Sequence, residues 1–162
     1  MHKLSLTSEI SVFSNVEELD ADRQILLEKA KIAAQDAYAP YSNFKVGAAV
    51  LLDDGKDTIV LGSNQENASY PVGLCAERVA IYSAVTQYPR TPIKRIAITI
   101  ISVNKDIVKP ISPCGACRQV IYETELRGQQ DIELILQGDL GDIYVLPTVK
   151  GILPLMFDSS FL

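Results

Sequence analysis

Apolar residues along the chain recur at two spacings, one typical of helices and the other of strands. The helical spacing predicts three helices, at residues 21–38 after an Asp20 cap, from 75 to about 87, and from 114 to about 126. Runs rich in β-branched residues predict strands at 45–52, 58–65, 94–103, 132–136 and 143–146. A weaker alternation over residues 3–13 predicts one further short strand.

Glycine and proline mark where these elements end. Pro40 is expected to stop the first helix, Gly55 to supply a positive φ in the turn between the first two main strands, and Gly128 to follow the third helix. Helices that alternate with a hairpin and single strands indicate an α/β sandwich, in which helices cover a mixed sheet. We expect one domain over residues 1–162, with residues 1–15 as an N-terminal extension.

Charge and composition narrow the classes of partner. The net charge of −5 and an isoelectric point near 4.9 argue against a nucleic-acid binder, which needs a basic surface. No apolar run reaches the length of a membrane span, and no signal peptide is evident, so we expect no membrane partner. The odd number of cysteines, three, excludes a complete disulfide framework and favours the reducing cytoplasm, where clustered cysteines bind metal.

The three cysteines carry the clearest chemical signal. Cys114 and Cys117 form a Cys-x-x-Cys pair after a proline, and Cys75 stands at another expected helix start. Three thiolates on one Zn²⁺ ion leave a fourth tetrahedral position open, which distinguishes catalytic from structural zinc. Taken singly, each cysteine has an alternative interpretation as a small buried hydrophobe. The only histidine, His2, is too close to the chain terminus to serve as a ligand.

Two charged residues follow Cys75 directly. Glu77 is placed to carry a proton for a water on the metal, although a solvated glutamate in the first turn of a helix would have the same sequence. Arg78 is interpreted in two ways, as a surface charge or as a donor to the cysteine sulfurs that offsets their negative charge.

A polar pair ends the second main strand. Asn64 and Glu66 share one face of an extended chain, where an amide and a carboxylate suit the hydroxyl groups of a sugar. The alternative is a solvated polar pair on an edge strand.

Five segments, in this order, resemble the cytidine deaminases, in particular their short homotetrameric form with three cysteines. The segments are APYSNFKVGAA at 39–49, NQENASY at 64–70, CAER at 75–78, PCGACRQ at 113–119 and LPLMF at 153–157. The resemblance covers residues 38–157, whereas the N-terminal extension falls outside it and the stretch 102–110 is longer than the family pattern. It implies a three-layer α/β/α sandwich around a mixed five-stranded sheet.

The resemblance also implies roles for individual residues. Cys75, Cys114 and Cys117 would hold one Zn²⁺ per chain and Glu77 would transfer protons. The ribose would be held by Asn64 and Glu66, and the pyrimidine by Phe44 and the backbone N–H groups of Ala76 and Cys114. A neighbouring subunit would contribute Phe157 to the pyrimidine site and Tyr70 to the ribose site, so that the active sites of a homotetramer are shared.

The expected activity is hydrolytic deamination of cytidine and 2'-deoxycytidine to uridine and 2'-deoxyuridine with release of ammonia, a pyrimidine-salvage reaction. Two alternatives stand beside it: deamination of another small amine heterocycle, such as a nucleotide, and a zinc-stabilised scaffold without turnover. For the apolar tail at 152–157, the alternative to a subunit interface is packing against the chain's own sheet.

Overall fold

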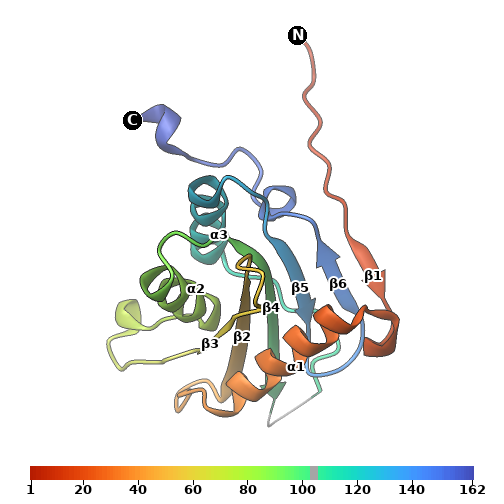
Figure 1. Cartoon of the computed structure of the whole chain (residues 1–162), viewed down its shortest axis with the longest axis vertical. Helices are drawn as coiled ribbons and strands as arrows, with labels where there is room; N and C mark the ends of the chain where they lie inside the picture. The colour runs from red at the N-terminus through yellow and green to blue at the C-terminus, as the bar shows by residue number, and fades with distance from the viewer. Residues whose placement is uncertain (103–105) are drawn as a thin grey trace.

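A computed structural model of the chain describes residues 1–102 and 106–162 and shows one six-stranded mixed sheet covered by helices (Figure 1). The strand order is β1-β6-β5-β4-β2-β3, and β4 and β5 run parallel while the other neighbours are antiparallel. The strands are β1 (Ser11–Phe13), β2 (Phe44–Leu52), β3 (Ile59–Ser63), β4 (Ile93–Ser102), β5 (Glu133–Gln137) and β6 (Ile143–Leu146), and the helices are α1 (Ala21–Gln35), α2 (Ala76–Gln87) and α3 (Gly115–Gly128).

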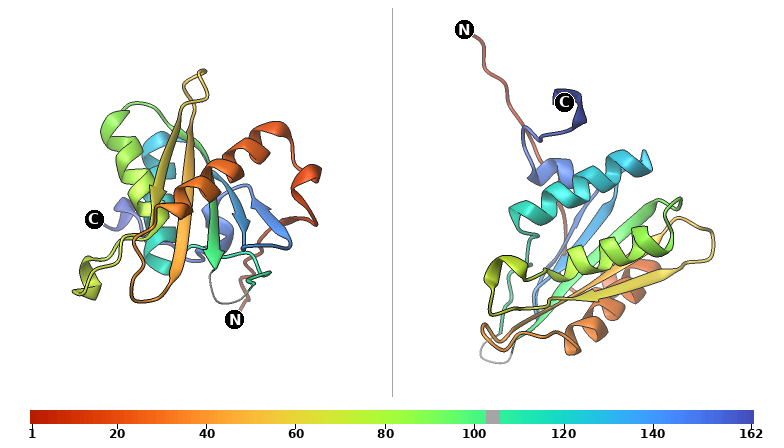
Figure 2. Two further views of the ribbon diagram at one scale, coloured as in Figure 1. Left: turned by 90° about the horizontal axis from the view of Figure 1, so that it is seen from below. Right: turned by 90° about the vertical axis from the view of Figure 1, so that its left-hand side faces the viewer.

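The helices form outer layers on both faces of the sheet, with α1 on one face and α2 and α3 on the other (Figure 2). Side chains that alternate along β2 separate into the two cores. Ala48 and Val50 pack in the cluster that includes α2 and α3, whereas Ala49 and Leu51 pack with α1. The predicted three-layer α/β/α sandwich is therefore confirmed.

The sheet has six strands, so the prediction of five was wrong by one edge strand. Of the alternating stretch 3–13, only β1 enters the sheet, where Val12 lies opposite Tyr144 of β6. The physical reason is that β6 would otherwise be an edge, and the N-terminal segment supplies partners for its backbone groups. Residues 1–10 are exposed and extend away from the sheet (Figure 1).

The first helix ends at Gln35, three residues before the predicted end at Tyr38. Tyr38 leaves the helix because its backbone pairs with the chain after β3: its N–H donates to Asn64 O at 3.0 Å, and its carbonyl accepts from Glu66 N at 2.8 Å. This pairing brings the loop that follows Tyr38 alongside Glu66.

The third helix continues through Gly128, which was predicted to lie just beyond it. Gln129 takes the left-handed conformation that caps the helix, with a φ of 53°. The end of the predicted strand at Val103 and part of the longer stretch 102–110 lie outside the described residues. From Ile107 onwards this stretch packs on the turn between β5 and β6, where the Ile107 carbonyl accepts from Asp139 N at 2.8 Å.

Gly62 of β3 allows α2 to approach the sheet closely. A Cβ atom at this position would lie 2.4 Å from Ala80 N and 2.6 Å from Ala76 O, both backbone atoms of α2. The small residue therefore fixes the distance between the sheet and the helix that begins after Cys75. None of the described helices is long and apolar enough to cross a bilayer.

Candidate active site

Two helix starts bring the three cysteines together. Cys75 and Cys114 are the N-cap residues of α2 and α3, and Cys117 lies buried in the first turn of α3. Their sulfur atoms all lie within 4.8 Å of one another, with 4.0 Å between Cys75 and Cys114 and 3.2 Å between Cys114 and Cys117. A tetrahedral zinc ion with Zn–S bonds of about 2.3 Å holds its sulfurs about 3.8 Å apart, so this donor set fits zinc.

The protonation of the thiols is set by their contacts with one another. The neighbouring Cys117 thiol lowers the pKa of Cys75 most, and the Arg78 guanidinium adds to this effect, so the pKa of Cys75 falls to about 5 despite partial burial. The same contact with Cys75, together with burial, raises the pKa of Cys117. The Cys75 thiol is therefore ready to bind a cation as the thiolate, and Cys117 has to lose its proton when a metal binds.

Glu77 lies on the first turn of α2 and is 4% exposed. Burial raises the pKa of its carboxyl group above the usual range. A carboxyl group that holds its proton more readily, beside a metal site, suits alternate uptake and release of a proton. Glu77 also lines the cleft described below, so it is accessible to a substrate there.

Arg78 turns its guanidinium group toward Cys75. Its Nη2 atom lies 3.8 Å from Cys75 Sγ and donates to Gly73 O at 3.3 Å. Of the two interpretations drawn from the sequence, this geometry favours a charge beside the cysteine sulfurs over a solvated surface arginine.

A cleft of about 940 Å³ opens next to the cysteines and gathers most of the predicted substrate residues. Its walls come from the loop before β2, the segment after β3, the start of α2 and the loop before α3. The predicted residues in its lining are Phe44, Asn64, Glu66, Tyr70, Cys75, Glu77, Arg78 and Cys114. Ala76, the first residue of α2, is fully buried behind this lining.

Asn64 holds the start of β2 in place. Its Oδ1 atom accepts from Val46 N at 2.7 Å, and its Nδ2 atom donates to Phe44 O at 2.9 Å. These bonds leave one amide N–H and one lone pair for another partner. Asn64 therefore positions Phe44, which lies at the cleft and is 37% exposed.

Glu66 is oriented by the loop that follows Tyr38. Its carboxylate accepts from Tyr41 N at 2.8 Å, from Ser42 N at 3.3 Å and from the Ser42 hydroxyl. These hydrogen bonds lower the pKa of Glu66, that from the Ser42 hydroxyl most. Tyr70 contacts the ring of Tyr41 edge-on, with 6.2 Å between the ring centroids.

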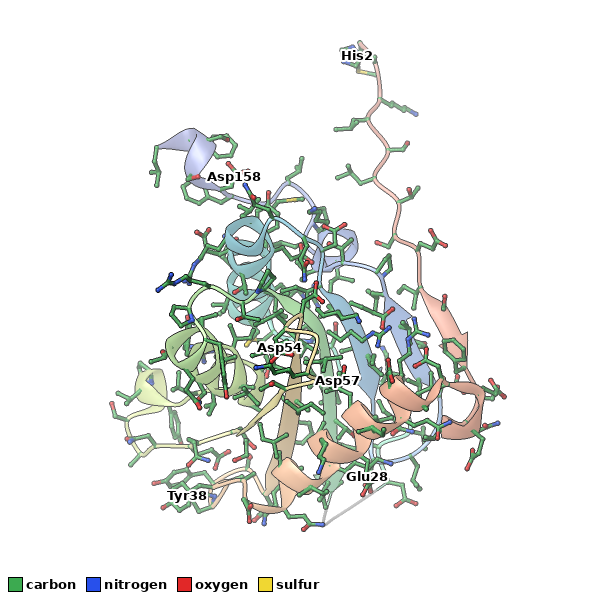
Figure 3. The ribbon with its side chains drawn as sticks, in the orientation of Figure 1. His2, Glu28, Tyr38, Asp54, Asp57 and Asp158 are labelled. Atoms are coloured by element: carbon green, nitrogen blue, oxygen red, sulfur yellow. The ribbon has the colours of Figure 1, made fainter. Side chains whose placement is uncertain are left out.

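Phe157 lies in the C-terminal tail, outside the lining of its own chain's cleft. Its ring is 55% exposed and stacks on Phe161 with centroids 5.5 Å apart. One part of the tail packs on its own chain and another part is free for a subunit interface. Ile152, Leu153 and Met156 pack against the core, whereas Leu155 projects into solvent. His2 lies at the outer end of the N-terminal segment, which extends away from the sheet (Figure 3).

Sequence reasoning missed several residues of the site. Ser42 and Tyr41 stand in the loop motif, but their contact with Glu66 depends on where Tyr38 leaves the helix. Ser112 and Ile111 line the cleft from the loop before Cys114, and Ile98 lines it from β4. Of the last three residues, only Ser112 had a signal in the sequence, namely its position beside the Pro-Cys motif.

Comparisons with known proteins agree with this geometry. Residues 20–129 match the family model described as the cytidine and deoxycytidylate deaminase zinc-binding region. A cytidine deaminase of Halalkalibacterium halodurans is 41% identical over 139 residues, which are 86% of this chain and 96% of that protein. A cytidine deaminase of Sporosarcina psychrophila is 41% identical over 80% of this chain and 90% of its own length.

Solved structures confirm the fold. The crystal structure of cytidine deaminase from Burkholderia pseudomallei superposes with a TM-score of 0.71 at 42% identity, over 82% of this chain and 97% of that one. That of the Mycobacterium tuberculosis enzyme gives a TM-score of 0.64 at 32% identity, over 86% of this chain and 99% of that one. The matched region contains both helix starts that carry the cysteines, and the chain therefore belongs to the cytidine and deoxycytidylate deaminase zinc-binding family.

Proposed function

We propose that the chain is a zinc-dependent cytidine deaminase, which converts cytidine and 2'-deoxycytidine to the uracil nucleosides with release of ammonia. The observation that carries the proposal is the cluster of Cys75, Cys114 and Cys117 with the buried Glu77 beside it, at the base of a cleft. A scaffold without turnover would need neither a buried carboxyl group nor an open cleft at the metal site.

The sulfur atoms of the three cysteines would hold the zinc ion next to the cleft. When bound, zinc would supply a Lewis acid that makes a water more acidic and a better nucleophile toward C4 of the pyrimidine. Glu77 would take a proton from the attacking water and deliver it to N3 of the ring. It would then take the proton of the new hydroxyl group on C4 and deliver it to the amine, so that C4 becomes a carbonyl as ammonia leaves. Arg78 offsets the negative charge of the three thiolates.

The rest of the cleft suits a nucleoside without a phosphate. Arg78 is the single cationic side chain among the described residues of the lining, and it is engaged with Cys75 and Gly73. Glu66 would repel a phosphate, whereas its carboxylate accepts readily from ribose hydroxyl groups. Asn64 keeps an N–H and a lone pair for the same sugar, and Phe44 offers a ring face to the pyrimidine.

The exposed tail supports a shared site in a homotetramer. Phe157 and Leu155 project from the body of the chain, and an exposed apolar segment is typical of an interface. In this assembly Phe157 and Tyr70 reach the cleft of a neighbouring subunit. The three free thiols suit a reducing compartment, and we place the enzyme in the cytoplasm.

The test is ammonia release from a panel of cytidine, 2'-deoxycytidine, 2'-deoxycytidine monophosphate and adenosine. We expect both cytosine nucleosides to be turned over, and the nucleotide to react with a kcat/KM at least about 10-fold lower because of the charge repulsion described above. Preferential reaction of the nucleotide would contradict a nucleoside substrate and indicate a deoxycytidylate deaminase instead. Absence of reaction with all four compounds by the zinc-loaded protein would overturn it.

A further inference from the structure

One face of α3 holds the C-terminal tail, defined here as residues 149–158. Gln119 Nε2 donates to Phe157 O at 2.9 Å, and the Tyr122 hydroxyl contacts Asp158 Oδ2 at 3.2 Å. At the root of the tail, Glu125 accepts from Val149 N at 3.1 Å. The tail thus follows the helix that carries two of the cysteines, with Asp158 at the far end (Figure 3).

Arg118 connects this tail to the cysteine loop. Its Nη1 atom donates to Ile152 O at 2.8 Å, and its Nε atom donates to Pro113 O at 2.8 Å. Its Nη2 atom donates to the Ser112 hydroxyl at 3.2 Å. Pro113 directly precedes Cys114, and Ser112 lines the cleft. One guanidinium group therefore joins the wall of the cleft to the start of the tail.

The planar guanidinium group holds these partners in a fixed relation. Its N–H groups point in set directions, so acceptors on two segments can be satisfied together only when the segments keep their relative positions. The Arg118 side chain is half-buried, which reduces the exchange of these bonds with water. Loss of the guanidinium would remove the connection between Ile152 and the loop that precedes Cys114.

We propose that Arg118 is a positioning residue that fixes the C-terminal tail relative to the cysteine loop, and thereby sets the place from which Phe157 reaches the pyrimidine. The effect on catalysis rests on the proposed function, in which Phe157 belongs to a shared site. The effect on the tail itself does not depend on that function.

A double-mutant cycle tests the catalytic part. Arg118→Met should lower kcat/KM for cytidine about 10-fold, mainly through a higher KM, with zinc content retained. In a Phe157→Ala background the same substitution should change kcat/KM less than about 2-fold, because its effect passes through Phe157. The same factor in both backgrounds would overturn the proposal. Arg118→Lys keeps the charge but loses the planar set of N–H donors, so its kcat/KM should lie between those of wild type and Arg118→Met. If Arg118→Met does not fold, Arg118→Lys replaces it in the cycle.

Arg127→Met is the matched control, since it removes the same charge from the exposed last turn of α3. It should leave kcat/KM and the mobility of the tail unchanged. An equal loss in Arg127→Met and Arg118→Met would show a general charge effect and contradict the proposal.

A fluorescence measurement tests the tail without any catalysis. The chain contains no tryptophan, so Phe161→Trp gives a single fluorophore beside Phe157. Arg118→Met in this background should lower the tryptophan anisotropy and increase its quenching by acrylamide, whereas Arg127→Met should change neither. Unchanged anisotropy and quenching in Arg118→Met would overturn the role of Arg118. This measurement needs no turnover, so it tests whether Arg118 positions the tail even if the protein releases no ammonia from cytidine.

Discussion

Two thiols of the site, those of Cys75 and Cys117, differ in the pH at which they ionise. In the metal-free protein the pKa of Cys75 is lowered to about 5 and that of Cys117 is raised, chiefly because the two thiols are neighbours. Because a lowered thiol pKa means that the thiolate is already formed above it, the alkylation rate of Cys75 by iodoacetamide should be nearly constant between about pH 6 and pH 8. Mass spectrometry of the modified peptides gives the rate for each cysteine. A rate that rises about 10-fold per pH unit over this range would contradict the lowered pKa.

Asn64 and Glu66 should differ when each is replaced by alanine. Asn64→Ala removes two bonds to the backbone of β2, so it should cost about 1–2 kcal/mol of unfolding free energy and also raise the KM for cytidine. Glu66→Ala removes hydrogen bonds to an exposed loop. It should therefore raise the KM for cytidine but lower the free energy of unfolding less than Asn64→Ala does. Urea unfolding and steady-state kinetics of both variants measure the difference, and equal destabilisation by the two would contradict it.

Individual site residues differ in how far the sequence could predict them. The cysteines and Glu77 were predictable because ligand spacing at helix starts is local, and the structure brings the three sulfurs together. The structural contacts of Asn64 and Arg118 were not predictable, since their partners lie 18 and 34 residues away along the chain.

At the scale of elements, the approach of α2 to the sheet depends on Gly62. Gly62→Ala would place a Cβ atom within 2.4 Å of the α2 backbone, so the helix must shift and stability should fall by about 1–3 kcal/mol. Gly128→Ala is the control, because its added Cβ would meet nothing closer than Pro92 Cβ at 3.4 Å. Thermal unfolding of the metal-free variants measures both, and a Gly62→Ala variant as stable as Gly128→Ala would contradict the close approach.

The elements themselves were largely predictable from apolar spacing, whereas their ends were not. The end of α1 is decided by pairing between Tyr38 and the segment after β3. The alternation over residues 3–13 predicted a strand, but its short extent and its place in the sheet are decided by the free edge of β6. Both are interactions between distant parts of the chain, which no local window contains. The left-handed conformation of Gln129 likewise replaced the glycine stop that the sequence suggested.

At the scale of the whole molecule, a shared site predicts complementation between two defective chains. Phe157→Ala and Glu77→Gln homotetramers should each have low activity, but in mixed tetramers some sites combine an intact Glu77 with an intact Phe157 from a neighbour. With random mixing at equal amounts about one quarter of the sites are restored. Ammonia release should therefore rise after the two proteins are unfolded and refolded together. Activity no higher than the average of the two separate samples would contradict a shared site.

The assembly has an independent measure in light scattering. A homotetramer of the 17.7 kDa chain gives about four times that mass. A fully active monomer would contradict the role given to Phe157.

The central claim is that Glu77 transfers protons in a zinc-dependent deamination of cytidine. The most direct test compares ammonia release from cytidine by Glu77→Gln and by wild type at equal zinc content per chain. Glutamine keeps the size of the side chain but cannot transfer the proton, so we predict that zinc stays bound while kcat falls at least about 100-fold. Zinc-loaded Glu77→Gln within a few-fold of wild type would contradict the assignment of proton transfer to Glu77.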